Sequence, residues 1–302
     1  MRPLRNLFIY LLVVFIGGAI LAPLIYNLVQ IAANHIEFLS PLAGKEFRRY
    51  LTRCMMVIAI IGLFPLFKSF GMKNLKELGL PSVKENKHRF LYGFLFGFIT
   101  LLIPVILAYG FGAIKINSAK GSSEIVKHLF NAIISAIVVG VIEETLFRGG
   151  ILGAIKKIYG WTTAILISSA IYSIVHFFSR VESPSSVQWY SGFVTLVMML
   201  RGFIEFNTLV PGFFNLFMVG TILGLFYKLT GNIYFSIGTH AGWVFWLKTY
   251  KFFAVFNPDA NQWFFGSSKL IDGWIVFFIL LLSFISILKA KKLNLKVFDV
   301  QD

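Results

Sequence analysis

The amino-acid sequence predicts an all-α fold, a polytopic transmembrane helix bundle of about eight spans with a buried polar site. Two observations of composition predict the membrane: 57% of the 302 residues are hydrophobic and 14% are charged, and the mean hydropathy is +0.79. A soluble chain of this length needs more charged surface to cover its core. The third observation is that carboxylates and histidines interrupt three of the apolar runs. Such groups are costly in a bilayer, so they are expected to face a protein interior or a wet cavity.

Eight windows of the chain are apolar over the roughly 20 residues that a helix needs to cross the hydrocarbon. They are residues 8–30, 51–70, 90–112, 129–149, 161–179, 209–229, 231–249 and 273–289. We find no internal repeat and no sign of a second soluble domain, so we expect residues 1–302 to form one membrane-embedded domain. Within it, residues 130–250 are expected to be the core with the catalytic motifs, and residues 290–302 a cytoplasmic tail.

The net charge of +15 comes from basic residues scattered at the ends of apolar runs. A nucleic-acid-binding protein would gather them into a stripe, so no nucleic-acid partner is expected. With eight spans, the basic N-terminus, the polar segment 71–89, Lys156 and Lys157 all fall on one side of the membrane. So does the tail with Lys289, Lys291, Lys292 and Lys296. Both termini are then predicted to be cytoplasmic. Because the chain is compact, we expect a bacterial cytoplasmic membrane, with lipid as a partner.

The segment 185–207 is harder to interpret as a span. Residues 194–200 are apolar, but Arg201 and Glu205 follow at a helical spacing of four. An interfacial or re-entrant helix fits this pattern best.

The run VIEETLFRGG at residues 141–150 places two carboxylates and an arginine at the end of an apolar window. Arg148 follows Glu144 by four residues, the spacing at which an acid and a base on one helix meet. Glu143 points about 100° away from Glu144. Pairing of Glu144 with Arg148 therefore leaves Glu143 as the candidate general base for a water molecule. If the acid and the arginine only locked two helices together, the second glutamate would be unexplained.

His176 and His240 each lie in a further apolar run, and Tyr172 shares the helix face of His176 at the preceding turn. Alone, either histidine would more often be a packing residue than a functional one. Three separate runs that each contribute an imidazole or a carboxylate predict one shared hydrolytic site. We assign no role to the remaining histidines, which are His35, His88 and His128.

These motifs resemble those of the CPBP intramembrane proteases, the CAAX-protease-and-bacteriocin-processing family that includes the type II CAAX prenyl endopeptidases. Glu143 to Gly149 is similar to the first motif, EExxxR, in its EExxFRG form. His176 corresponds to the histidine of the second motif, FxxxH, and His240 to that of the third, HxxxN or HxxxD. The resemblance covers roughly residues 130–250. Two positions depart from it, because Tyr172 replaces the phenylalanine and Val244 the asparagine or aspartate.

The resemblance implies hydrolysis of a membrane-embedded or lipidated peptide by a glutamate-activated water, without a covalent acyl-enzyme. Glu143 would be the base and His176 would hold the water. Glu144 and Arg148 would brace the site. His240 would face the developing oxyanion, where fixed donors contribute most. Valine at 244 cannot donate a hydrogen bond, so His240 acts with another donor, for which Asn215 is a candidate, or activity is weakened or lost.

Three alternatives remain open. Two glutamates and two histidines could hold zinc, but the HExxH helix of many zinc proteases is absent, so no cofactor is the first expectation. A proton-coupled transporter could use the same buried groups, although repeated halves are missing. A catalytically silent scaffold or immunity protein would agree with Val244. The sequence does not name a partner subunit.

Overall fold

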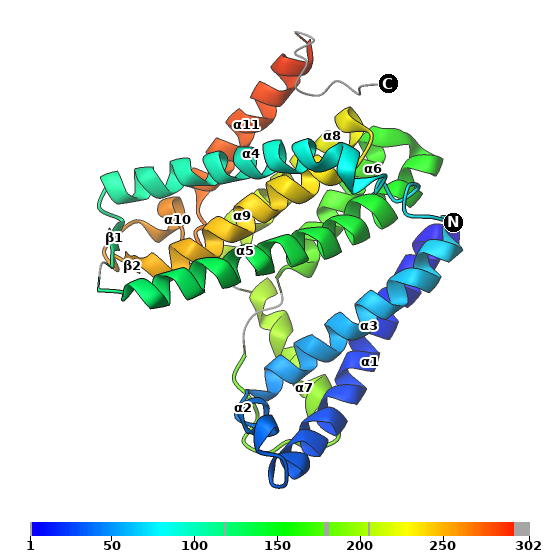
Figure 1. Cartoon of the computed structure of the whole chain (residues 1–302), viewed down its shortest axis with the longest axis vertical. Coiled ribbons are helices and arrows are strands. Elements are labelled where there is room, and N and C mark those ends of the chain that lie inside the picture. Colours follow the sequence, from blue (N-terminus) through cyan, green and yellow to red (C-terminus); the bar gives the residue numbers. More distant parts are fainter. Residues whose placement is uncertain (1, 118, 178–180, 205, 293–302) are drawn as a thin grey trace. The chain divides into compact units, whose positions relative to one another are not determined.

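The computed structural model describes residues 2–117, 119–177, 181–204 and 206–292. This part of the chain is mostly helical, and its one sheet has two short strands, which confirms the all-α class (Figure 1). It forms two compact units, one of Met1–Met72 with Phe177–Glu205 and one of Lys73–His176 with Phe206–Asp302. The single domain over 1–302 stays a prediction. Residues 293–302 of the predicted tail, with Lys296, lie outside the described residues.

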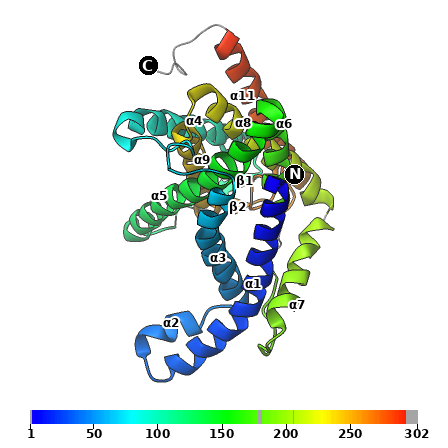
Figure 2. The ribbon, with the colours of Figure 1, turned by 90° about the vertical axis from the view of Figure 1, so that its right-hand side faces the viewer.

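The first unit is built on two long helices. α1 (Arg2–Ala33) packs against α3 (Phe47–Ser69), and the short α7 (Ser191–Met199) packs on α1 (Figure 2). Gly192 makes the second contact possible, because a Cβ atom there would collide with the backbone carbonyl of Ala19. The unit also contains η1 (Glu37–Leu39), α2 (Ser40–Ala43) and η3 (Leu200–Phe203).

α7 lies within the segment for which the sequence predicts an interfacial or re-entrant helix. Its nine residues rise about 14 Å, which is too short to cross the hydrocarbon. Its position at a membrane surface stays a prediction. Arg201 lies in η3, whereas Glu205 is outside the described residues.

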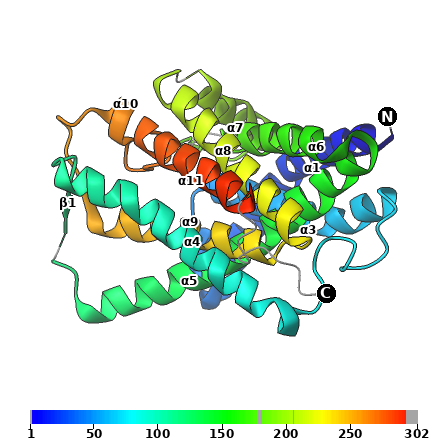
Figure 3. The same ribbon diagram turned by 90° about the horizontal axis from the view of Figure 1, so that it is seen from above.

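The second unit surrounds one central helix. Its elements are α4 (Val83–Gly110), β1 (Ile114–Ile116), α5 (Ser122–Glu144), the π-helix η2 (Thr145–Leu152), α6 (Gly153–Val175), α8 (Phe206–Thr230), α9 (Tyr234–Phe253), β2 (Ala254–Phe256), α10 (Gln262–Phe265) and α11 (Trp274–Lys292). The central helix, α9, packs against α4, α5 and α8, and α11 lies on α8 and α4 (Figure 3). The antiparallel pair β1–β2 joins the end of α4 to the end of α9.

Four glycines bring α4 and α9 into backbone contact. Gly93 and Gly97 on α4, and Gly238 and Gly242 on α9, each lie so close to the other helix that a Cβ atom would collide with one of its backbone carbonyls. Both pairs have the small-xxx-small spacing that lets helices approach closely in a membrane. This contact fixes the position of α9, which carries His240.

The predicted count of eight spans is not confirmed. Six helical segments of the described chain are long and apolar enough to cross a membrane: Arg5–Ala33, Phe47–Ser69, Val83–Gly110, Ser122–Val175, Leu209–Thr230 and Trp274–Lys292. The fourth has 54 residues and contains the predicted spans 129–149 and 161–179, apart from residues 176–179. Its winding is interrupted at Gly160, whose φ of 75° and ψ of 175° are not helical.

α9 corresponds to the predicted span 231–249 but is not among the six. Its first ten residues are all buried. A helix covered by protein does not need an apolar surface toward lipid, so polar groups such as His240 lower its hydropathy without exposing charge to the bilayer. The predicted loop 71–89 is also shorter than expected, because α4 begins at Val83.

Candidate active site

The two glutamates lie where α5 ends and a π-helix begins. α5 ends at Glu144, and Thr145–Leu152 form a π-helix, which is a winding often found at functional sites. Gly140, one turn earlier, lets α5 approach α9, since a Cβ atom there would lie 3.0 Å from the Ile237 carbonyl oxygen. This approach brings the acidic end of α5 to the helix that carries His240.

Glu144 and Arg148 form the ion pair that their spacing predicts. Nη1 of Arg148 lies 3.1 Å from Oε1 of Glu144, and the two side chains are 1% and 0% exposed. Nη2 of Arg148 donates a hydrogen bond of 3.3 Å to the Gly220 carbonyl of α8. The arginine therefore links η2 to α8 as well as neutralising a fully buried carboxylate.

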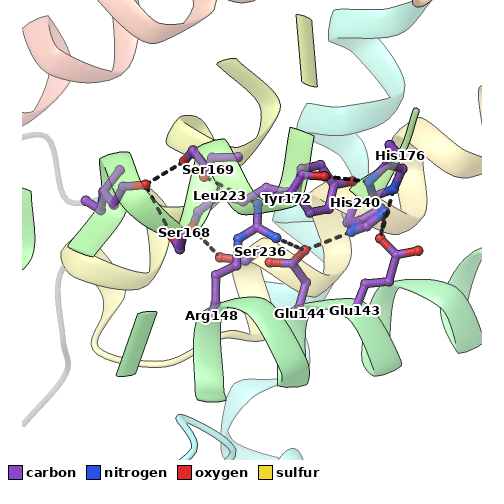
Figure 4. Close-up of polar contacts among 12 residues, drawn as sticks. Glu143, Glu144, Arg148, Ser168, Ser169, Tyr172, His176, Leu223, Ser236 and His240 are labelled. Carbon is purple, nitrogen blue, oxygen red and sulfur yellow. Dashed lines mark hydrogen bonds and ion pairs between the residues drawn. The ribbon is translucent and has the colours of Figure 1, made fainter. Parts of the chain in front are cut away.

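His240 is held by the same carboxylate. Its Nδ1 lies 2.8 Å from Oε1 of Glu144 (Figure 4). A carboxylate only accepts hydrogen bonds, so Nδ1 carries a proton. Nε2 is then the nitrogen that can interact with another group. That Nε2 lies 3.7 Å from Oε2 of Glu143.

His176 reaches Glu143 from the end of α6. Its Nδ1 donates a hydrogen bond of 2.7 Å to the carbonyl of Tyr172, which fixes the proton on Nδ1. Its Nε2 then faces Oε2 of Glu143 at 3.5 Å. Both imidazoles therefore have Nδ1 tied to their surroundings and Nε2 directed at one carboxylate oxygen.

The open side of this cluster is formed by Glu143 and His176, whose side chains are 27% and 30% exposed, against 5% for His240. Distances of 3.5 Å and 3.7 Å exceed those of good hydrogen bonds. Glu143 Oε2 accordingly has no hydrogen-bond partner. Four further buried side-chain atoms of this region also have none: Glu144 Oε2, Thr145 Oγ1, Arg148 Nε and Arg148 Nη1. Nη1 thus pairs with Glu144 by charge, without good hydrogen-bond geometry. Of the two glutamates, only Glu143 belongs to a partly exposed side chain, so its Oε2 is the oxygen suited to bind a water or a substrate.

Asn215 does not serve as the extra donor suggested by the sequence. Its Nδ2 donates to the carbonyls of Ile271 at 2.7 Å and Gly273 at 2.9 Å, so both amide hydrogens hold the segment before α11. Val244 is half-buried on α9, one turn after His240. The place of the motif's polar residue is therefore filled by an apolar side chain.

No group of three or more His, Cys, Asp or Glu side chains in the described part of the chain is arranged to hold a metal ion.

Of the histidines without an assigned role, His128 stacks on the ring of Phe252, with 3.9 Å between centroids. His88 lies within α4, and His35 follows α1.

Sequence reasoning missed two features of the site. The π-helix was not anticipated. Within it, Gly149 packs so closely that a Cβ atom there would lie 2.7 Å from the Leu78 carbonyl oxygen. The pairing of α4 with α9 was also missed. The spacing of Gly93 with Gly97 and of Gly238 with Gly242 was the signal for it.

A model of one protein family matches residues 125–246, and its description is type II CAAX prenyl endopeptidase Rce1-like. The match covers less than half of the chain and includes Glu143, Glu144, Arg148, His176 and His240. No curated protein and no solved structure matches the chain. Together with the six apolar helices, the match supports an integral membrane protein and, at the level of the family, a CAAX-type intramembrane endopeptidase. Residues 125–246 are therefore Rce1-like, which confirms the family that the three motifs predicted.

Proposed function

We propose that this protein is an intramembrane endopeptidase that cleaves a membrane-embedded or lipidated peptide with a water molecule activated by Glu143. One observation carries the proposal: Nε2 of His176 and Nε2 of His240 lie 3.5 Å and 3.7 Å from the same oxygen, Oε2 of Glu143. That oxygen is buried and has no hydrogen-bond partner. A water bound there would contact a carboxylate that can take its proton and imidazoles that can orient it.

The proposed reaction proceeds in two steps. The water oxygen attacks the carbonyl carbon of the scissile peptide bond while its proton passes to Glu143, which gives a tetrahedral intermediate with a negative oxygen. The carbon–nitrogen bond then breaks, and the proton moves from Glu143 to the departing amine. The products are a carboxylic acid and an amine, so neither a covalent acyl-enzyme nor a cofactor is needed.

The histidines take different roles in this proposal. His176, the more exposed of the two, holds the water beside Glu143. His240 faces the oxyanion, and because Nδ1–H is bound to Glu144, it donates from Nε2 when both nitrogens carry protons. The buried Glu144–Arg148 pair fixes the orientation of that ring.

The match to CAAX prenyl endopeptidases makes a prenylated peptide the first substrate class to test. The experiment uses the purified full-length protein in liposomes with a farnesylated peptide that ends in a CAAX-type sequence, and mass spectrometry of the products. Wild type is expected to release the last three residues, and Glu143→Gln to be inactive. The matched control is Glu124→Gln on the same helix, because Glu124 is exposed and its ion pair, at 3.3 Å, is with Lys120, away from the histidines. Equal cleavage by wild type and Glu143→Gln would contradict the proposal.

One observation favours a second candidate, a catalytically silent scaffold or immunity protein. Val244 leaves the oxyanion region without the polar residue of the third motif. In that case Glu143→Gln would leave the biological function intact, and wild type would not cleave the peptide.

A proton-coupled transporter would instead show a proton flux that depends on Glu143. Loading the same liposomes with a pH-sensitive dye would measure that flux.

From the distribution of basic residues, we further propose that both termini are cytoplasmic. The compact chain favours a bacterial cytoplasmic membrane as its location. The chain has a single cysteine, Cys54, so a Cys54→Ser background allows cysteines to be placed singly. In the variants Lys76→Cys and Lys292→Cys, the new cysteine is expected to react with a membrane-impermeant maleimide only after the cells are opened. Labelling of either one in intact cells would contradict this orientation.

A further inference from the structure

The helix α7 has an apolar outer face and a small, partly polar inner one. Its buried residues, on the side of α1, are Ser191, Gly192, Thr195 and Met199. Its exposed residues are Phe193, Val194, Val197 and Met198. A surface helix of a soluble protein has the reverse arrangement. The outer face of α7 is therefore suited to hydrocarbon, which agrees with the expected position of this helix at a membrane surface.

A groove runs along this outer face. It is lined by the exposed residues of α7 together with Leu200, Arg201 and Ile204. Its volume of about 630 Å³ is several times the roughly 150 Å³ of an apolar cavity that binds benzene. The groove therefore has room for a hydrocarbon chain.

Arg201 places a positive charge beside this apolar lining. It lies in η3, directly after α7, and it is exposed. Within the described residues, which do not include Glu205, no carboxylate forms an ion pair with Arg201. A guanidinium can bind a phosphate group through two parallel hydrogen bonds.

The charge of the lining distinguishes between lipid headgroups. Because the groove is lined by a guanidinium and by no carboxylate, the ammonium group of a zwitterionic lipid would have no partner there. A headgroup with a net negative charge is complementary to this lining. The groove and Arg201 together therefore match an anionic lipid better than a zwitterionic one.

We propose that the groove on α7 binds one anionic phospholipid, with an acyl chain along the apolar lining and the phosphate group at Arg201. The site uses none of the residues of the proposed hydrolysis, so it does not depend on that function. The contact of the headgroup weakens as salt is added, because it is an exposed charge pair. The contact of the chain does not weaken, since burial of apolar surface does not depend on charge.

The test uses the purified full-length protein in phosphatidylcholine liposomes that contain a trace of photoreactive lipid. The probes are phosphatidylglycerol and phosphatidylcholine that carry the same diazirine in the acyl chain. After illumination, mass spectrometry measures the label on residues 191–204. In wild type, phosphatidylglycerol is expected to label this segment about 10-fold more than phosphatidylcholine, as a hydrogen-bonded charge pair predicts.

Two variants separate the headgroup from the chain. Arg201→Gln is expected to reduce the labelling by phosphatidylglycerol to the level of phosphatidylcholine. Val197→Trp fills the groove and is expected to reduce the labelling by both lipids. The matched control is Arg53→Gln, which removes an exposed arginine of α3 in the same unit and is expected to keep the wild-type pattern.

Three results would overturn the site. The first is equal labelling of residues 191–204 by the two lipids in wild type. The second is wild-type labelling in Arg201→Gln. The third is a dimer of the chain in mild detergent that Val197→Asp dissociates, because the outer face of α7 would then be an interface between two copies. Cleavage of a peptide is not part of this test, so its result is independent of the proposed hydrolysis.

Discussion

Glu143 and His176 meet through Oε2 and Nε2 at 3.5 Å, although they lie on different helices and 33 positions apart in the sequence. The distance is just beyond a good hydrogen bond, while Nδ1 of the histidine is firmly held by a backbone carbonyl at 2.7 Å. The hydrogen bond of Nδ1 therefore fixes the orientation of the ring. Nε2 can then bind a third molecule, such as water, together with the carboxylate of Glu143.

The two histidines are expected to respond differently to substitution by alanine. His176→Ala should lower kcat/KM about 100-fold or more with little change in stability, because its side chain is 30% exposed. His240→Ala should lower both kcat/KM and the stability of the fold. It removes a buried hydrogen bond to Glu144, which is worth about 1–3 kcal/mol. Cleavage rates and thermal unfolding of the purified variants measure this. Equal stability of the two variants would contradict the structural role of His240.

Breaking the buried ion pair is expected to be severe. Arg148→Met leaves Glu144, which is 0% exposed, as an uncompensated charge, and should cost about 3–5 kcal/mol. The double variant Glu144→Gln with Arg148→Met should recover part of that stability without recovering activity. Thermal unfolding in detergent would show it. A single variant as stable as wild type would mean that the pair does not brace the site.

Gly97→Ala is expected to disturb the site from the opposite face of α9. Its methyl group would collide with the carbonyl of Thr239, the residue before His240. Overpacking of this kind costs about 1–3 kcal/mol, and the displaced imidazole should reduce kcat. Gly110→Ala on the same helix is the control, since a Cβ atom there meets nothing within 4 Å. Equal behaviour of the two variants would contradict the close packing of α4 and α9.

Val244→Asn is expected to raise kcat about 10-fold or more, because it adds a polar side chain one turn after His240 on the same helix face. Val244→Leu, which adds no donor, should not. Both rates come from the liposome assay. If asparagine leaves kcat unchanged in a stable protein, donors at the oxyanion do not limit the reaction.

Chelation is expected to have no effect on cleavage, since the proposed reaction uses only Glu143, the two histidines and water. Treatment with 1,10-phenanthroline followed by dialysis should leave kcat unchanged. Loss of activity that is restored by added zinc would favour the metal-dependent alternative.

Contacts within one helix could be predicted from the sequence, whereas contacts between helices could not. The pairing of Glu144 with Arg148 follows from a spacing of four, and it survives the change to a π-helix. Which imidazole meets which carboxylate depends on how the helices pack. The resemblance to the protease family implied that His240 faces the oxyanion, which stays a prediction, but it did not reveal that Nδ1 is bound to Glu144.

The eight predicted spans become six helical segments because two of them share one apolar segment and because protein covers part of α9. α9 is buried along its first half, so its polar residues face other helices, and its hydropathy no longer measures membrane crossing. The interruption at Gly160 is a backbone feature inside a continuous apolar segment. It falls in the gap between the predicted spans 129–149 and 161–179.

The most direct test of the account is an experimental structure at a resolution that shows ordered water near Glu143. We predict a water within about 3 Å of Oε2 of Glu143 and of at least one of the two Nε2 atoms. A dry site, in which Glu143 points away from His176 and His240, would contradict the proposed hydrolysis.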